Sequence, residues 1–350
     1  MNEEKRSSKE LKLSDCMKSP HLISMENVQE CNPEWLVPKY IPKGHITLLA
    51  GDGGTGKSFI WCKIAAGVSS GRKCFLEQEE NAPQKVLFFS SEDSLEYTLK
   101  ARLKNAGANL ENIFSLSLKD ETFQDIKFNS SILKEIILES RPALVIFDPL
   151  QAFLPPDTQM GQRNAMRNCL NPLIAMGEKL GTTFLIIAHT NKRRGTYGRN
   201  RIADSADIWD IARSVMIAGT TQDKNIHYLS HEKSNYGELG KTSLFSIVDG
   251  AVKVEGYTDL RDADFVRERD DSFYQAPHRQ EAENFIVEYL KEGKQRVTDL
   301  DSAAKASGIS LGTLKRAKSN LRKSHILGIE NEGYGKSKMY YAYLIDQKMT

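Results

Sequence analysis

The sequence predicts an α/β protein with a mostly parallel β-sheet and flanking helices, followed by a smaller carboxyl-terminal unit. Three observations predict this fold class. An apolar run at 46–50 leads into a glycine-rich segment at 51–58 and then into a helical pattern. Further apolar runs alternate with helical patterns, as they do where crossover helices join parallel strands. The 350 residues also suffice for two domains with separate cores.

The segment 51–58 matches the phosphate-binding pattern G-x4-G-K-S/T at every fixed position. Glycines let the backbone N–H groups point inward around phosphates, and the helix that begins near Gly56 adds the positive end of its dipole. We expect Lys57 to contact the β- and γ-phosphates and the Ser58 hydroxyl to hold Mg²⁺, so ATP and Mg²⁺ are the predicted cofactors. The alternative, a structural glycine turn, is disfavoured by the strand before it and the helix after it. The predicted nucleotide-binding residues are Gly51, Asp52, Gly53, Gly54, Thr55, Gly56, Lys57, Ser58 and Phe59.

The elements after this loop are predicted from the periodicity of apolar residues and from the glycine and proline residues that separate the runs. Apolar runs predict strands at 85–90, 143–148 and 182–188. Helical patterns lie at 95–106, 132–140 and 162–180. Shorter, glycine-punctuated runs predict an antiparallel edge, with strands at 215–218, 226–231, 243–248 and 251–256.

Polar residues follow the three parallel strands where their carboxyl ends should share one sheet edge. Asp148 ends the second of these strands and is the expected acid on the metal side. Glu92 follows the first and is a candidate general base, although an acidic first turn or N-cap of the next helix would explain it too. His189 follows the third and is placed to contact the γ-phosphate, with a structural histidine as the alternative.

A basic segment at 191–202 follows His189 and Thr190. It contains no acid and two glycines. We expect its cations to pair with the phosphates of single-stranded DNA and its tyrosine to stack on a base, with a solvated loop as the alternative. The predicted DNA-binding residues here are Lys192, Arg193, Arg194, Tyr197, Arg199 and Arg201.

The order of the phosphate loop, Ser91-Glu92-Asp93, the Phe147-Asp148 pair and Ala188-His189 resembles the RecA-like ATPases of the plasmid RepA helicase type, over roughly residues 30 to 257. The resemblance implies a ring, usually a hexamer, with ATP between subunits. It implies that Glu92 is the catalytic base, Asp148 the metal-side acid and His189 the sensor that links phosphate to nucleic acid. Arg213 matches best as the arginine supplied by the neighbouring subunit, and Lys233 is a second cation that would act across the interface.

The resemblance therefore implies an ATP-dependent helicase or translocase that acts on single-stranded DNA as a homo-hexamer, in the replication of a mobile element. Two alternatives stay open. One is a RecA-like recombination mediator that binds DNA without unwinding it. The other is a DNA-binding regulator in which ATP controls assembly.

The carboxyl-terminal region predicts a second domain that begins near Arg279. Nine of the thirteen residues at 259–271 are charged, which predicts a solvated linker. Helical patterns at 282–292, 298–307 and 310–323, then strands at 326–330 and 339–344, predict a winged helix-turn-helix. Lys315, Arg316 and Lys318 on its third helix are the expected contacts to duplex DNA, with a protein-docking module as the alternative.

Composition sets the remaining expectations. The five cysteines form no C-x-x-C pair, which argues against a disulfide framework and favours the cytoplasm. No apolar run is long enough to span a bilayer, so no membrane partner is expected. The predicted domains are a disordered leader at 1–22, an ATPase domain at 23–257, a linker at 258–278 and the winged helix at 279–350.

Overall fold

The computed structural model describes residues 22–73, 75–76, 80–156, 158, 163–191, 196–202, 206–274, 277–333 and 338–345. It forms two compact units, Met1–Glu34 and Trp35–Thr350. In the first unit, the described residues include one helical turn, η2 (Met25–Asn27), which contains no buried residue. The rest of the fold concerns the second unit.

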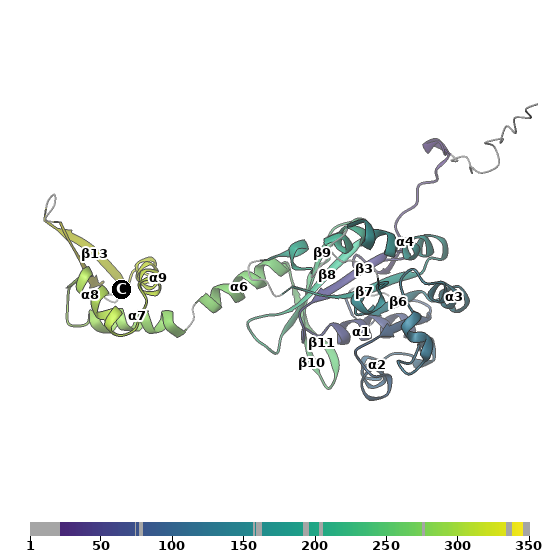
Figure 1. The fold of residues 1–350 in the computed structure, drawn as a ribbon, viewed down its shortest axis with the longest axis horizontal. Coiled ribbons are helices and arrows are strands. Elements are labelled where there is room, and N and C mark those ends of the chain that lie inside the picture. Colours follow the sequence, from purple (N-terminus) through teal and green to yellow (C-terminus); the bar gives the residue numbers. More distant parts are fainter. Residues whose placement is uncertain are drawn as a thin grey trace, which may run out of the picture. The chain divides into compact units, whose positions relative to one another are not determined.

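Nine strands of the described chain form one sheet in the order β11-β10-β9-β8-β3-β7-β6-β4-β5 (Figure 1). The six strands from β8 to β5 run parallel, and β9, β10 and β11 extend the sheet in antiparallel pairs. This confirms the predicted α/β class with a mostly parallel sheet, which is the arrangement of a RecA-like fold. The strands are β3 (Ile46–Gly51), β4 (Val86–Ser90), β5 (Ile113–Ser115), β6 (Leu144–Asp148), β7 (Thr183–His189), β8 (Ser214–Thr220), β9 (His227–Ser234), β10 (Thr242–Val248) and β11 (Ala251–Thr258).

The central strand β3 is buried at every residue and lies between β7 and β8. Its register pairs Gly51 with His189 of β7, and the register of β4 and β6 pairs Ser90 with Asp148. The strands that carry the predicted chemistry therefore end at one edge of the sheet, as parallel strands of matched length must.

Helices cover both faces of the sheet and enclose two apolar cores (Figure 1). Helices α1 (Lys57–Ser70) and α2 (Lys100–Ala106) cover one face, and α3 (Ser131–Ser140), α4 (Arg163–Leu180) and α5 (Ala206–Ile211) cover the other. The Ser130 hydroxyl caps α3 by accepting from the backbone N–H of Leu133 at 3.4 Å. Shorter elements are β1 (Trp35–Val37), β2 (Ile41–Pro42), η3 (Leu95–Leu99), η4 (Leu110–Asn112), η5 (Glu121–Asp125), η6 (Leu150–Phe153) and η7 (Gly198–Arg201).

The charged region after β11 contains a helix, α6 (Asp262–Tyr274), in which Asp262, Phe265 and Val266 are buried. Phe265 stacks on Tyr228 of β9 with ring centroids 4.1 Å apart, and Val266 is buried. The start of α6 is therefore not fully solvated as the sequence predicted for 258–278, because two apolar residues among the charges are buried there.

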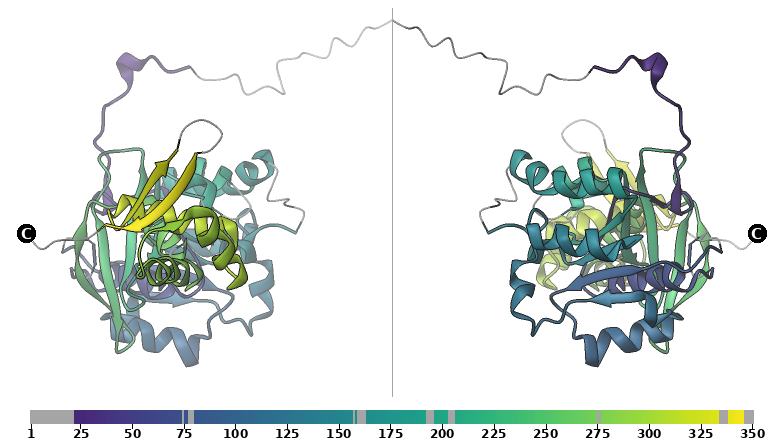
Figure 2. Two further views of the ribbon diagram at one scale, coloured as in Figure 1. Left: turned by 90° about the vertical axis from the view of Figure 1, so that its left-hand side faces the viewer. Right: turned by 90° about the vertical axis from the view of Figure 1, so that its right-hand side faces the viewer.

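The carboxyl-terminal elements contain α7 (Pro277–Tyr289), β12 (Gln295–Arg296), α8 (Val297–Ala306), α9 (Leu311–Lys323), β13 (Leu327–Glu332) and β14 (Met339–Leu344). The strands form a small sheet in the order β12-β14-β13, and the β13–β14 hairpin lies beside the helices of this group (Figure 2). A separate apolar core joins them, centred on Ile286, Leu300 and Leu314. The order of three helices and a hairpin agrees with the sequence prediction, which missed the short β12.

Candidate active site

The phosphate loop joins β3 to α1 in a conformation that requires glycine at two positions. Gly54 and Gly56 have φ values of 78° and 86°, which side chains with a Cβ rarely adopt. At Gly51 a Cβ atom would lie 2.7 Å from the carbonyl oxygen of Ala218 on the neighbouring strand. The loop therefore needs glycine both for its curvature and for its close contact with the sheet.

Lys57 is largely buried at the start of α1. Its Nζ donates to the carbonyl oxygens of Gly51 at 2.9 Å and Asp52 at 2.8 Å. Burial lowers the pKa of Lys57, and the nearby carboxylates of Asp148 and Asp52 oppose that shift. The ammonium group is thus held over the loop by the loop's own backbone.

A cavity of about 280 Å³ opens in front of this loop. It brings together the residues predicted from three separate strands, with Glu92, Asp148 and His189 on its wall. The lining comprises Gly53, Gly54, Gly56, Lys57, Ser58, Phe59, Glu92, Asp93, Arg102, Asp148, His189 and Ile247. These side chains can hold a nucleotide's phosphates and present carboxylates to them in one place.

Asp148 is buried at the end of β6 and is held by two donors. Trp61 Nε1 donates to its Oδ2 at 2.8 Å, and the Ser58 hydroxyl donates to the same oxygen at 3.4 Å. Burial raises the pKa of Asp148, and the bond from Trp61 lowers it.

Hydroxyl and carboxylate oxygens that converge in this way suit a hard divalent cation that also binds phosphate oxygens. Ser58 and Asp148 are therefore fit to hold Mg²⁺ together with a nucleotide. Within the described residues, no group of three or more histidine, cysteine or acidic side chains forms a metal site by itself.

Glu92 and His189 lie side by side, with Oε1 and Nε2 3.6 Å apart. Their side chains are 59% and 39% exposed, so water and a nucleotide can reach both. The N-cap alternative for Glu92 does not hold, because the hydroxyl of Ser94 caps η3 by accepting from the Tyr97 N–H at 3.3 Å. Glu92 is thereby left facing the cavity.

Sequence reasoning missed two residues of this site, Trp61 and Arg102. The Arg102 guanidinium lies 4.5 Å from the ring centroid of Phe59 and donates to Asp93 at 2.7 Å. The contacts of Arg102 with Phe59 and of Trp61 with Asp148 join elements that are distant in the sequence, so no local pattern predicts them.

Arg213 and Lys233, the two cations expected to act across a subunit interface, differ in how available their side chains are. Arg213 is exposed, and its backbone N–H donates to Ile46 at the start of β3, which is the edge of the sheet opposite the phosphate loop. Five strand residues span about 17 Å, so Arg213 lies too far away to serve the nucleotide site of its own chain.

Lys233 is not available for the role predicted for it. Its Nζ donates to the carbonyl oxygens of Trp209, Asp210 and Ala212 at 2.7, 3.1 and 2.8 Å. All three ammonium protons are used, so Lys233 caps the end of α5.

The basic segment after β7 is only partly described, and Lys192, Arg193 and Arg194 lie outside the described residues. Tyr197 is 38% exposed, and the guanidinium of Arg267 lies 5.5 Å from its ring centroid. Arg199 is partly exposed and pairs with Asp210 at 2.5 Å.

Arg201 corrects the prediction that it binds DNA directly. It is 2% exposed, and its guanidinium bridges two carboxylates. Nη2 donates to Asp52 at 3.1 Å, and Nη1 donates to the buried Asp262, which also accepts from Tyr228 at 2.9 Å. The segment itself has no acids, but acids from the phosphate loop and α6 neutralise Arg201.

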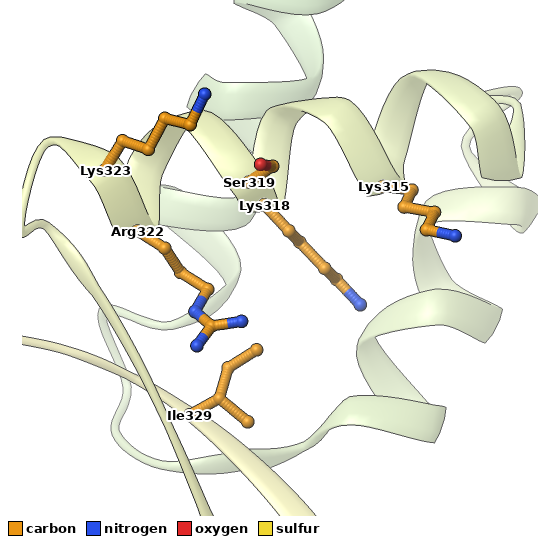
Figure 3. A pocket seen from close by; sticks show the side chains of 6 residues that line it. All are labelled: Lys315, Lys318, Ser319, Arg322, Lys323 and Ile329. Carbon is orange, nitrogen blue, oxygen red and sulfur yellow. The ribbon is translucent and has the colours of Figure 1, made fainter.

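A second candidate interface is a basic groove of about 570 Å³ between α9 and β13 (Figure 3). Its lining comprises Lys315 and Lys318, two of the residues expected to contact duplex DNA, together with Ser319, Arg322, Lys323 and Ile329. Arg316 is exposed but does not line this groove. Lys318 pairs with Asp301, so part of the groove's charge is neutralised.

The comparisons with known proteins agree with this geometry. The AAA domain family matches residues 13–195, just over half of the chain. The DNA repair protein RadA of Bacillus subtilis (strain 168) is 24% identical over 222 residues, which are 63% of this chain and 42% of RadA. The chain thus spans less than half the length of that relative. The family match, the complete phosphate loop and the parallel sheet together show that this chain belongs to the AAA domain family and is a P-loop ATPase with a RecA-like fold.

Proposed function

We propose that the protein is an ATP-driven translocase or helicase that moves along single-stranded DNA as a homo-hexameric ring, in the cytoplasm, during replication of a mobile element. The observation that carries this proposal is the contact between Glu92 and His189 at 3.6 Å, since only Thr190 separates His189 from the basic segment at 191–202. The residue beside the expected base is therefore continuous with the expected DNA-binding loop. In this proposal, a shift of His189 on loss of the γ-phosphate would be passed along the backbone to the segment that binds the nucleic acid.

In this proposal each residue of the cavity has one task. Lys57 binds the β- and γ-phosphates, and Ser58 and Asp148 hold Mg²⁺, which supplies charge neutralisation when bound. Glu92 orients and polarises the attacking water. Arg213 of the neighbouring subunit adds positive charge at the γ-phosphate, consistent with its distance from the site of its own chain.

The DNA contacts of this proposal lie on two surfaces. Lys192, Arg193, Arg194, Tyr197 and Arg199 contact the single strand. We further propose that the carboxyl-terminal elements are a winged helix whose Lys315, Arg316 and Lys318 contact duplex DNA. The groove in Figure 3 supports the second contact, because four cations line it and, among the described residues, Asp301 is the acid that pairs with one of them.

Two other functions have a specific observation in their favour. The name of the relative, a DNA repair protein, favours a recombination mediator that binds DNA without unwinding it. The basic groove favours a regulator that finds a duplex site and uses ATP to control assembly. A strand-displacement assay separates the helicase from both.

The deciding experiment measures ATP turnover and particle mass with and without single-stranded DNA. The proposal expects faster turnover with DNA and a mass close to six subunits. Turnover that is indifferent to single-stranded DNA would remove the motor function. Retention on one duplex sequence with no strand displacement would establish the regulator instead.

A further inference from the structure

Asp52, the second residue of the phosphate loop, is bonded on two sides. Its backbone carbonyl oxygen accepts from Lys57 Nζ at 2.8 Å. Its carboxylate accepts from Arg201 Nη2 at 3.1 Å and from the Thr190 hydroxyl. One residue therefore holds both the lysine of the nucleotide site and the two ends of the segment 190–202.

The two ends of this segment are fastened to each other. Thr190 and Ile202 form an antiparallel bridge, and the backbone N–H of Asn191 donates to the carbonyl oxygen of Arg201 at 2.7 Å. The Asn191 side chain also donates to the carbonyl oxygen of Asn200 at 2.6 Å. Binding of a strand between these ends would therefore act on Thr190 and Arg201 together, because the two ends are hydrogen-bonded to each other.

The two ion pairs of Arg201, with Asp52 and with Asp262, differ in how much free energy it costs to break them. Asp262 is fully buried, and movement of Arg201 away from it would break an ion pair that is shielded from water. The side chain of Asp52 is 29% exposed, so water can replace Arg201 there at a much smaller cost. The contact between Arg201 and Asp52 is therefore the one that yields when the segment moves.

We propose that Asp52 and Arg201 form a positioning pair that couples DNA binding on the segment 190–202 to the placement of Lys57 in the nucleotide site. Both act through Lys57 and touch no reacting atom. This inference rests on the proposed function, because it needs the segment to bind a nucleic-acid strand. Such a coupling is reciprocal, so DNA changes ATP affinity by the same factor as ATP changes DNA affinity.

The test uses Asp52→Asn in the full chain. Asparagine keeps the size and an acceptor for Thr190 but lacks the charge that holds Arg201, and the partly exposed position tolerates the change. The dissociation constant of a fluorescent ATP analogue is measured with and without a saturating oligothymidine strand. We expect a coupling factor of about 5 to 150 in the wild type, the usual range for allosteric pairs. In Asp52→Asn it should fall close to 1, with the affinity for DNA alone changed by no more than about twofold.

Asp210→Asn is the matched control. It removes the acid that pairs with Arg199 of the same segment and makes no contact with Asp52. It should keep the coupling factor of the wild type. If Asp52→Asn keeps it as well, the positioning pair is overturned and the proposed function stands. If DNA leaves nucleotide affinity and turnover unchanged in the wild type, both are overturned.

Discussion

The indole N–H of Trp61 donates to Oδ2 of Asp148 at 2.8 Å, and both side chains are buried. The bond favours the charged form of a carboxyl whose burial raises its pKa. A helix that packs against the sheet thus orients the carboxylate that we propose as the metal-side acid.

Replacing Trp61 with phenylalanine should weaken the metal site. Trp61→Phe keeps the ring contact with Phe88, whose centroid lies 5.3 Å away, but loses the donor. We expect the Mg²⁺ concentration for half-maximal ATP turnover to rise about tenfold, as when other partners of metal ligands are lost. A magnesium titration of turnover measures this. Trp209→Phe, on the other face of the sheet, is the control, and an equal rise there would assign the effect to packing.

Replacing Glu92 with glutamine should separate binding from hydrolysis. Glu92→Gln keeps the shape of the cavity but cannot accept a proton, so turnover should fall at least about 100-fold while ATP affinity stays within about twofold. Single-turnover hydrolysis and nucleotide binding measure the two effects. Glu96→Gln changes an exposed acid that pairs with Lys119 and should behave as wild type. Normal turnover in Glu92→Gln would show that another group is the base.

Arg213 should act on the nucleotide of a neighbouring subunit. Arg213→Ala alone should lose turnover by about 1,000-fold, the usual effect of an arginine finger, and Lys57→Ala alone should also lose turnover because the phosphates lose their lysine. Mixing the two variants should restore part of it, because some interfaces then combine an intact Lys57 with an intact Arg213. Arg72→Ala, at another exposed cation, should turn over normally. No recovery on mixing would contradict a role in trans.

Stability should fall as the pH drops from about 6.5 toward 4. His231 is fully buried, with Nδ1 accepting from the Gly240 N–H at 2.9 Å and Nε2 lying 3.1 Å from the Ser214 hydroxyl. Burial lowers the pKa of His231 from 6.5 to about 4. Between these values the unfolded chain binds a proton that the folded chain does not, which favours unfolding by up to about 3 kcal/mol. Burial also lowers the pKa of His45 and His227, and these shifts have the same sign.

Urea unfolding at pH 7.5 and pH 5 measures this effect. His231→Gln should remove about one proton from the pH dependence, about 1.4 kcal/mol per pH unit at its steepest. His325→Gln changes an exposed histidine and should leave the slope as it is. The same slope in all three proteins would show that His231 does not set it.

The groove of the carboxyl-terminal elements should bind duplex phosphates. The double variant Lys315→Ala and Arg322→Ala should lower duplex affinity and reduce the salt slope of binding by about 2, close to one unit per lost phosphate contact. Titrations of a labelled duplex at several salt concentrations measure both quantities. Lys291→Ala with Lys305→Ala removes two cations outside the groove and should have little effect. Equal losses in both double variants would point to charge alone rather than to this groove.

The sequence predicted the sheet well because its strands are buried apolar runs with clear ends. The run at 143–148 became β6 (Leu144–Asp148), and Asp148 came to the phosphate loop because parallel strands end together. The acids that neutralise Arg201 and the donor that holds Asp148 come from residues 61 to 149 positions away. Such partners are set by tertiary packing and leave no local signal. The burial of Phe265 could not be predicted from the charged segment 259–271 either, because it depends on the contact with Tyr228 of β9.

Lys57 has consequences for which molecules can occupy the loop. Its ammonium donates to the carbonyl oxygens of Gly51 and Asp52. A ligand has to replace both bonds, so weak or singly charged anions gain little by entering. A triphosphate offers several oxygens at once and can replace both hydrogen bonds of Lys57. The loop therefore favours polyphosphate ligands, because any ligand competes with the loop's own carbonyl oxygens for the ammonium group.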